Sequence, residues 1–250
     1  MEQDFLLIVG IGFLAQIIDG ALGMAYGVTT NAFLLALGIP PATASASVHA
    51  AEIFTTGASG LSHLALRNVD RRLLTRLLIP GVLGAIVGAC LLSFLPVNPI
   101  RFVVALYLAC MGTVILCKSW KKSTPTGHIT GKITGLGLAG GFFDALGGGG
   151  WGPIVTSTLV ARGGEPRFTI GSVNAAEFFI ALAASFTFFL TIGLGYWRNV
   201  LGLVLGGVLA APLAAFLCKR IPGRALMLLV GMLIILLSLR AMAQVLGWHP

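Results

Sequence analysis

Long apolar runs, separated by short polar or glycine-rich stretches, occupy most of the 250-residue chain. A transmembrane helix needs about 20 mostly apolar residues. Two shorter runs, Ala25–Leu37 and Trp151–Ala161, each follow a glycine-rich break and are typical of half-helices or re-entrant hairpins. The pattern predicts an all-α polytopic membrane protein with eight firm segments and two short ones. The eight firm runs are Phe5–Gly23, Ala42–Leu66, Leu73–Leu95, Ile100–Cys117, Ile133–Leu146, Phe168–Tyr196, Val200–Cys218 and Ala225–Leu239.

The composition excludes most other classes of protein. Hydrophobic residues make up 57% of the chain and charged residues only 10%, whereas a soluble domain carries about 25% charged residues. A soluble enzyme, a nucleic-acid-binding domain and a disordered chain are therefore excluded, and the lipid bilayer is the expected solvent. The four cysteines form no CxxC pair, so neither a zinc site nor a disulfide framework is indicated. Nothing in the sequence suggests a cofactor.

The chain contains an internal repeat. Residues 47–54 (SVHAAEIF) and 172–179 (SVNAAEFF) share six of eight positions at an offset of 125 residues. The same offset relates Asp19 to Asp144 and Tyr26-Gly27 to Trp151-Gly152. We therefore expect two repeats of about five helical segments each, residues 1–120 and 133–250, joined by a cytoplasmic linker at 121–132.

The basic residues indicate how these halves are oriented. Four loops hold 13 of the 16 lysines and arginines: Arg67–Arg76, Lys118–Lys132, Arg162–Arg167 and Lys219–Arg224. The positive-inside rule places such loops in the cytoplasm. The two halves must then insert with opposite orientations, with both termini facing outward. Inverted repeats of this kind are typical of secondary transporters, whose substrate sites lie near the membrane midplane where broken helices meet.

Four of the eight carboxylates lie within apolar sequence, and they form two repeat-related pairs. A charge at the bilayer centre costs roughly 2.5–3.5 kcal/mol, so such residues usually face a wet cavity or an ion site. His49 and Glu52 share one helix face, as do Asn174 and Glu177. These four residues are expected to form a polar midplane site in which the glutamates carry a proton or bind a cation. The alternative is a neutral glutamic acid that only forms hydrogen bonds between helices.

The other two acidic residues, Asp19 and Asp144, precede the glycine-rich breaks. Each could cap the half-helix that follows or bind a cation together with freed carbonyl groups. The breaks could expose NH groups at a half-helix N-terminus, which suits an anion, although small residues also serve close helix packing. Ser47 and Ser172 could donate hydrogen bonds to an anion or bond to their own backbone. The break glycines are Gly20, Gly23, Gly147, Gly148, Gly149 and Gly150.

Two further motifs indicate other functions more weakly. Gly57-Ala-Ser-Gly60, with His63 nearby, fits an intramembrane serine hydrolase built on Ser59, but the second half lacks the motif. His49-Ala-Ala-Glu52 has the spacing of a metal-binding helix, yet the repeat has asparagine in place of the histidine.

The order of these motifs resembles the TauE/SafE family of bacterial multi-pass membrane proteins. Each half has an early aspartate beside a glycine-rich break, then Ser-Val-x-Ala-Ala-Glu, then a basic loop. The resemblance covers roughly residues 5–240. It implies export of sulfite, sulfonates or similar small sulfur-containing anions across the bacterial inner membrane, without fixing the substrate. It is carried by Ile18–Gly27, Ser47–Phe54, Phe143–Gly152 and Ser172–Phe179.

Four ionised carboxylates would repel an anionic substrate. Burial favours the neutral form of a carboxyl group, and protonated glutamates could donate hydrogen bonds to sulfite. Proton coupling through Glu52 and Glu177 follows as a hypothesis, with a sodium site at Asp19 or Asp144 as the competing scheme. The alternative function is a metal-cation or proton/cation carrier that uses the carboxylates directly. The expected partners are thus a small anion, the lipid bilayer and a coupling H⁺ or Na⁺, with no nucleic acid.

Overall fold

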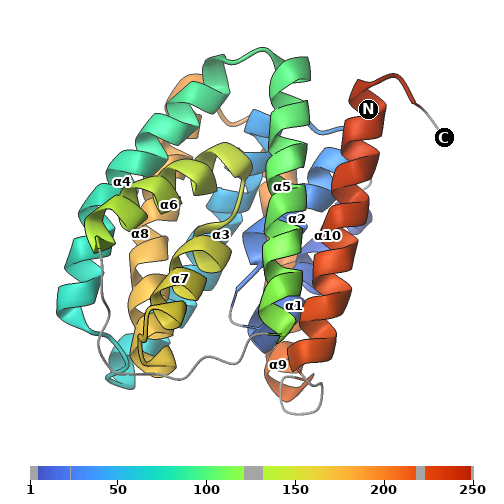
Figure 1. Ribbon diagram of the computed structural model, residues 1–250. Coiled ribbons are helices and arrows are strands. Elements are labelled where there is room, and N and C mark those ends of the chain that lie inside the picture. The colour runs from blue at the N-terminus through green and yellow to red at the C-terminus, as the bar shows by residue number, and fades with distance from the viewer. Residues whose placement is uncertain (1–4, 23, 121–131, 218–222, 249–250) are drawn as a thin grey trace.

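The computed structural model describes residues 5–22, 24–120, 132–217 and 223–248, and this part of the chain is helical with no strand (Figure 1). All ten predicted segments overlap helices, and the second short segment combines a π-helical turn, η1, with α7. The helices of the first half are α1 (Phe5–Leu22), α2 (Tyr26–Ala36), α3 (Pro41–Ala65), α4 (Arg71–Phe94) and α5 (Val97–Trp120). Those of the second half are α6 (Ile133–Gly147), η1 (Gly152–Thr156), α7 (Ser157–Ala161), α8 (Pro166–Ile192), α9 (Trp197–Leu217) and α10 (Gly223–Val245).

Local chemistry explains several helix boundaries. Pro41 and Pro166 occupy the first positions of α3 and α8, where the missing N–H of proline costs no hydrogen bond. Asp70 caps α4, because its Oδ1 accepts hydrogen bonds from the backbone N of Arg72 (2.8 Å) and Leu73 (3.2 Å). The apolar run predicted at 168–196 ends early, at Ile192, because Gly193 takes φ 73° and a turn follows.

In the described part of the chain, four helices are long and apolar enough to cross a membrane: α4, α5, α8 and residues 224–245 of α10. The stretches 5–19, 133–147, 152–161 and 197–210 are apolar but shorter. Helix α3 has 25 residues, but many of them are small and polar. The linker predicted at 121–132 lies, apart from Lys132, outside the described residues.

Glycines bring helices of different halves into close contact. A Cβ atom on Gly141 of α6 would collide with the backbone of Gly81 in α4, and one on Gly206 of α9 with the carbonyl of Val9 in α1. Such close backbone approach is the usual use of small residues between membrane helices. The first helix of each half therefore packs on the fourth helix of the other half.

Helices that correspond in the repeat also pack together, and they run antiparallel. In the α3–α8 pair, Gly57 lies against the ring of Phe178, and Gly60, further along α3, lies against Ala175. In the α5–α10 pair, Arg101 donates to Gln244 (2.8 Å) near one end, and Gly112 meets Gly231 further along. Helices α5 and α10 stand side by side in Figure 1. Antiparallel packing is what two inverted halves require, and the inversion itself stays a prediction.

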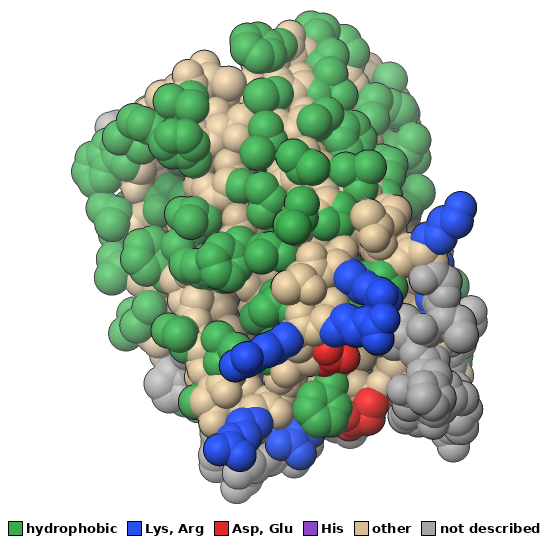
Figure 2. Space-filling view, turned by 90° about the vertical axis from the view of Figure 1, so that its left-hand side faces the viewer, with side chains coloured by type: hydrophobic (Ala, Val, Ile, Leu, Met, Phe, Trp, Pro, Cys, Tyr) green, Lys and Arg blue, Asp and Glu red, His purple; other side chains and the backbone are tan. Residues whose placement is uncertain are grey.

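The surface separates an apolar band from a basic end. Figure 2 shows hydrophobic side chains over most of one face, with lysines and arginines gathered at its lower end. Two predicted cytoplasmic loops meet at this basic end, because Arg167 donates a hydrogen bond to Asn68, and Ser172 accepts one from the backbone N of Asp70 (2.8 Å). An apolar band with a charged end is the surface expected of a membrane protein.

Candidate functional site

The two acidic residues before the breaks have the same contact in both halves. Asp19 accepts a hydrogen bond from the backbone N of Tyr26 (3.1 Å), and Asp144 accepts one from the backbone N of Trp151 (2.8 Å). Each aspartate thus binds an otherwise unpaired N–H at the start of a half-helix, as the capping interpretation expects. The residue just before each of these N–H groups has positive φ: 94° at Ala25 and 143° at its repeat equivalent, Gly150.

The second break depends on glycine for its backbone shape. Gly147 ends α6, and Gly148, Gly149 and Gly150 follow with φ of 65°, 135° and 143°, a region that side chains disfavour. Two side chains of the first half hold this segment: Asn31 of α2 donates to the carbonyl of Gly147, and Tyr107 of α5 donates to that of Gly149 (3.0 Å). In the first break, Gly20 lies inside α1, and Gly23 is outside the described residues.

The two breaks touch each other inside the protein. A Cβ atom on Gly27 would lie 2.8 Å from Cα of Gly149, and one on Gly152 would lie 2.9 Å from Cβ of Met24. The first half-helix (α2) and the second half-helix (η1 with α7, residues 152–161) therefore begin at the same place. Helix N-termini carry a partial positive charge, so this meeting point favours negative charge.

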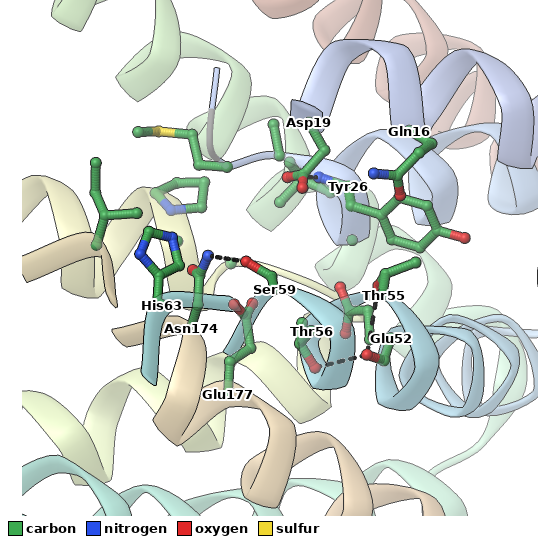
Figure 3. A pocket seen from close by; sticks show the side chains of 18 residues that line it. Gln16, Asp19, Tyr26, Glu52, Thr55, Thr56, Ser59, His63, Asn174 and Glu177 are labelled. Carbon is green, nitrogen blue, oxygen red and sulfur yellow. Dashed lines mark hydrogen bonds between the residues drawn. The ribbon is translucent and has the colours of Figure 1, made fainter. Parts of the chain in front are cut away.

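A cavity of about 240 Å³ opens beside these helix starts. Four of the predicted acidic and polar site residues line it: Asp19 from α1, Glu52 from α3, and Asn174 and Glu177 from α8 (Figure 3). The structure thus brings both repeat-related glutamates to one space. The other residues that line the cavity are Gln16, Met24, Ala25, Tyr26, Gly27, Val28, Thr55, Thr56, Ser59, His63, Gly150, Gly152, Pro153 and Ile170.

Glu52 is the most deeply buried carboxylate in this cavity, at 3% exposure. A Cβ atom on Gly27 would lie 2.6 Å from its Oε1, so a side chain at this position would displace the carboxyl group from the start of α2. Its Oε2 atom has no hydrogen-bond partner in the described part of the chain. Thr55 and Thr56 donate to the backbone carbonyl of Glu52 and not to its carboxyl group. Within the described residues, this carboxyl group therefore keeps an oxygen available to a proton or a ligand in the cavity that it lines.

His49 lies outside the cavity lining and binds Asp144. Its Nε2 is 3.2 Å from Oδ2 of Asp144, and its Nδ1 is 2.8 Å from the carbonyl of Ser45. Ser45 also donates to the carbonyl of Ala145 (2.6 Å). These contacts tie α3 of the first half to the C-terminal end of α6 in the second.

The two serines of the repeated motif also lie away from the cavity lining. Ser47 donates to the carbonyl of Thr43 (2.7 Å) in its own helix, and Ser172 contacts the backbone of Asp70. In this structure both serines therefore bind backbone groups.

Several polar residues that line the cavity were not predicted from the sequence pattern. Gln16 precedes Asp19 by three positions on α1, and Thr55, Thr56 and His63 continue the Glu52 face of α3. The helical spacing of 52, 55, 56, 59 and 63 could have revealed this polar face. Gln16 has no counterpart in the repeat, since position 141 is glycine.

Ser59 and His63 are the residues of the hydrolase motif, and their contacts bear on that alternative. Ser59 accepts a hydrogen bond from Asn174 (2.8 Å), while Nδ1 of His63 is 3.3 Å from Nδ2 of Asn68. Within the described residues, no group of three or more His, Cys, Asp or Glu side chains could hold a metal ion.

Apolar helices suited to a bilayer, together with two broken helices that meet at a polar cavity, are features of membrane transporters. Residues 8–241 match the family described as Sulfite exporter TauE/SafE, and the chain belongs to this family. It is also 43% identical over 241 residues to "Probable membrane transporter protein YtnM" of Bacillus subtilis (strain 168), in an alignment that covers 93% of this chain and 80% of that protein. No solved structure matches the chain. The protein is therefore a membrane transporter and not an enzyme, which removes the hydrolase alternative.

Proposed function

We propose that this protein is a secondary transporter that exports a small sulfur-containing anion, such as sulfite or a sulfonate, across the bacterial inner membrane. Its two halves, residues 1–120 and 133–250, are inverted repeats joined by a cytoplasmic linker. The observation that carries the proposal is the cavity at the meeting point of the two half-helices. The family and the relative support transport, and the cavity suggests how an anion is held.

The start of α2 supplies the favourable potential for an anion. Its first residues, Tyr26 and Gly27, line the cavity together with the neutral polar side chains of Gln16 and Asn174. Amides donate hydrogen bonds to oxyanions, and the helix dipole adds positive potential at this end. One water molecule takes about 30 Å³ in the liquid, so a cavity of about 240 Å³ has room for an anion of a few atoms.

Glu52 and Glu177 provide the coupling to protons. Each would donate a hydrogen bond to the anion when protonated and repel it when ionised, so loading a proton and loading the anion favour each other. The unpartnered Oε2 of Glu52 supports this role. Figure 3 places the side chain of Glu177 beside Asn174 and Ser59, facing the same space.

The cavity extends toward the basic end of the protein. It follows α3 from Glu52 to His63, and Ile170 near the start of α8 also lines it. Glu52 and His63 are eleven residues apart on α3, so this part of the cavity is about 16 Å long. An anion arriving from the cytoplasm would thus enter past the basic loops, which is the direction that export requires.

The test is efflux of sulfite from liposomes containing the purified protein, with sulfate and taurine as comparison substrates. We expect saturable efflux that a pH gradient accelerates. The double variant E52Q/E177Q should lose the pH dependence, whereas E165Q, at the basic end and outside the cavity, should keep it. Unchanged pH dependence in the double variant would rule out coupling through these glutamates, and no flux of any sulfur anion through folded protein would rule out the substrate class.

A competing scheme uses sodium. Asp19 lines the cavity beside Met24 and Ala25 of the first break, and carboxylate and carbonyl oxygens are suitable ligands for a hard cation. This scheme predicts efflux that depends on sodium at constant pH and that D19N abolishes. The same liposomes, filled with choline in place of sodium, distinguish the two schemes.

A further inference from the structure

Lys118, in the last turn of α5, has an unusual position for a lysine in this protein. Among the described lysines and arginines, only Lys118 and Arg101 are not exposed. Both lie on α5, close to its opposite ends. Both are half-buried, and because removing a cation from water is costly unless strong acceptors surround it, the partners of these two side chains can be compared directly.

Arg101 has strong acceptors and Lys118 has weak ones. Arg101 donates to the carbonyl of Leu35 (2.6 Å) and to Oε1 of Gln244 (2.8 Å). The ammonium of Lys118 contacts the sulfur of Met24 (3.1 Å) and the hydroxyl of Ser157 (3.1 Å). An ammonium has three donors, and a thioether is a weak acceptor. The charge of Lys118 is therefore poorly compensated by the described side chains that it contacts.

The surroundings of Lys118 suit an anion better than a cation. Met24 lines the cavity and lies two residues before the start of α2, whose positive dipole end disfavours a neighbouring cation. Ser157 belongs to the second half-helix. Lys118 is thus separated from the cavity by one flexible side chain, and it contacts residues at both half-helices.

We propose that Lys118 is a binding residue for the transported anion at the cytoplasmic entrance of the cavity, and that Met24 is the side chain that moves aside. An oxyanion or sulfonate replaces the sulfur of Met24 as the partner of the ammonium, close to the start of α2. Methionine is suited to this exchange because its side chain is unbranched and flexible. The inference deepens the proposed function and rests on it.

The test compares K118Q, K118R and K132Q in the liposome efflux assay. Lys132 is a matched control, because it is an exposed lysine outside the cavity lining. We expect the half-saturating sulfite concentration of K118Q to rise about tenfold or more, as for the loss of a hydrogen bond to a charged group, with little change in maximal rate. K132Q should stay within about twofold of the unaltered protein, and K118R, which keeps the positive charge, should raise the half-saturating concentration less than K118Q does. Equal half-saturating concentrations in K118Q and the unaltered protein would overturn the inference while leaving the proposed function intact. If the role of Lys118 were purely structural, K118Q would instead lower the maximal rate and the yield of folded protein.

A binding measurement separates failure of the inference from failure of the proposed function. The unaltered protein in detergent should be stabilised against heat by sulfite or sulfate, K118Q should lose this stabilisation, and K132Q should keep it. This readout needs no transport, so it applies even where no efflux occurs and the proposed function has failed. Equal stabilisation of K118Q and the unaltered protein, or no stabilisation of either, contradicts a role for Lys118 in anion binding.

Discussion

The imidazole of His49 contacts the carboxyl group of Asp144 across the boundary between the two halves, with 3.2 Å between Nε2 and Oδ2. Both side chains are buried, at 0% and 1% exposure. The other oxygen of Asp144 caps the second half-helix at Trp151. His49 therefore fixes the carboxyl group that positions the start of this half-helix. The repeat has Asn174 in place of His49, and its amide binds Ser59 instead, so the two halves differ at this point.

We expect H49L to destabilise the protein. Leucine fills part of the space but leaves Oδ2 of Asp144 buried without the imidazole, and an unsatisfied buried polar group costs about 1–3 kcal/mol. H49Q, whose amide can still donate to the carboxyl group, should lose less. The measurement is the apparent melting temperature of each purified variant in detergent. An H49L protein as stable as the unaltered one would show that this contact contributes nothing.

Asp144 should matter more for stability than Asp19. Replacing a cap by alanine costs about 0.5–2 kcal/mol, which applies to D19A and D144A alike, but D144A also loses the contact with His49. The melting temperature should therefore fall further for D144A. A double-mutant cycle with H49L isolates the shared contact, since contacting residues show coupling of about 0.5–3 kcal/mol. Additive effects would mean that His49 and Asp144 act independently.

The second break should tolerate no side chain at Gly149. Its φ of 135° is strained for alanine, and the added Cβ would collide with the backbone of Gly27 and Val28. Backbone strain of this kind costs about 1–3 kcal/mol before the collision is counted, so G149A should yield little folded protein on size-exclusion chromatography. G135A is the matched control, because Gly135 lies in α6 with open space around it and alanine favours a helix. A normal yield of G149A would show that the two breaks can separate.

Much of the fold could be predicted from the sequence because hydrophobic length and glycine breaks act locally. All ten segments were found, including the short ones at α2 and at η1 with α7. The end of α8 was missed, because residues 193–196 continue the apolar run while the positive φ of Gly193 ends the helix. Hydropathy detects apolar stretches but does not detect a change in backbone conformation.

The candidate site could be predicted only in part. The repeat identified Asp19, Glu52, Asn174 and Glu177, and all four line one cavity. Which side chains pair across helices depends on tertiary packing, so the contact of His49 with Asp144 could not be read from a spacing of three residues to Glu52. Lys118 was counted only as part of a basic loop, because its partial burial depends on how α5 packs beside Met24.

The repeat makes a direct prediction about membrane topology. Arg67-Asn68-Val69 and Arg198-Asn199-Val200 are repeated motifs, yet they lie at opposite ends of the protein: the first precedes α4, and the second begins α9 after the turn that ends α8. Inverted halves therefore place Arg67 in the cytoplasm and Arg198 outside.

In a background whose four cysteines are replaced, R198C should react with a membrane-impermeant maleimide on intact cells, whereas R67C should react only after permeabilisation. Both positions are exposed at helix ends, so each variant controls for the reactivity of the other. Labelling of both from outside would contradict the inverted orientation, and the reverse pattern would place the basic loops, and with them the cavity entrance, on the outer side.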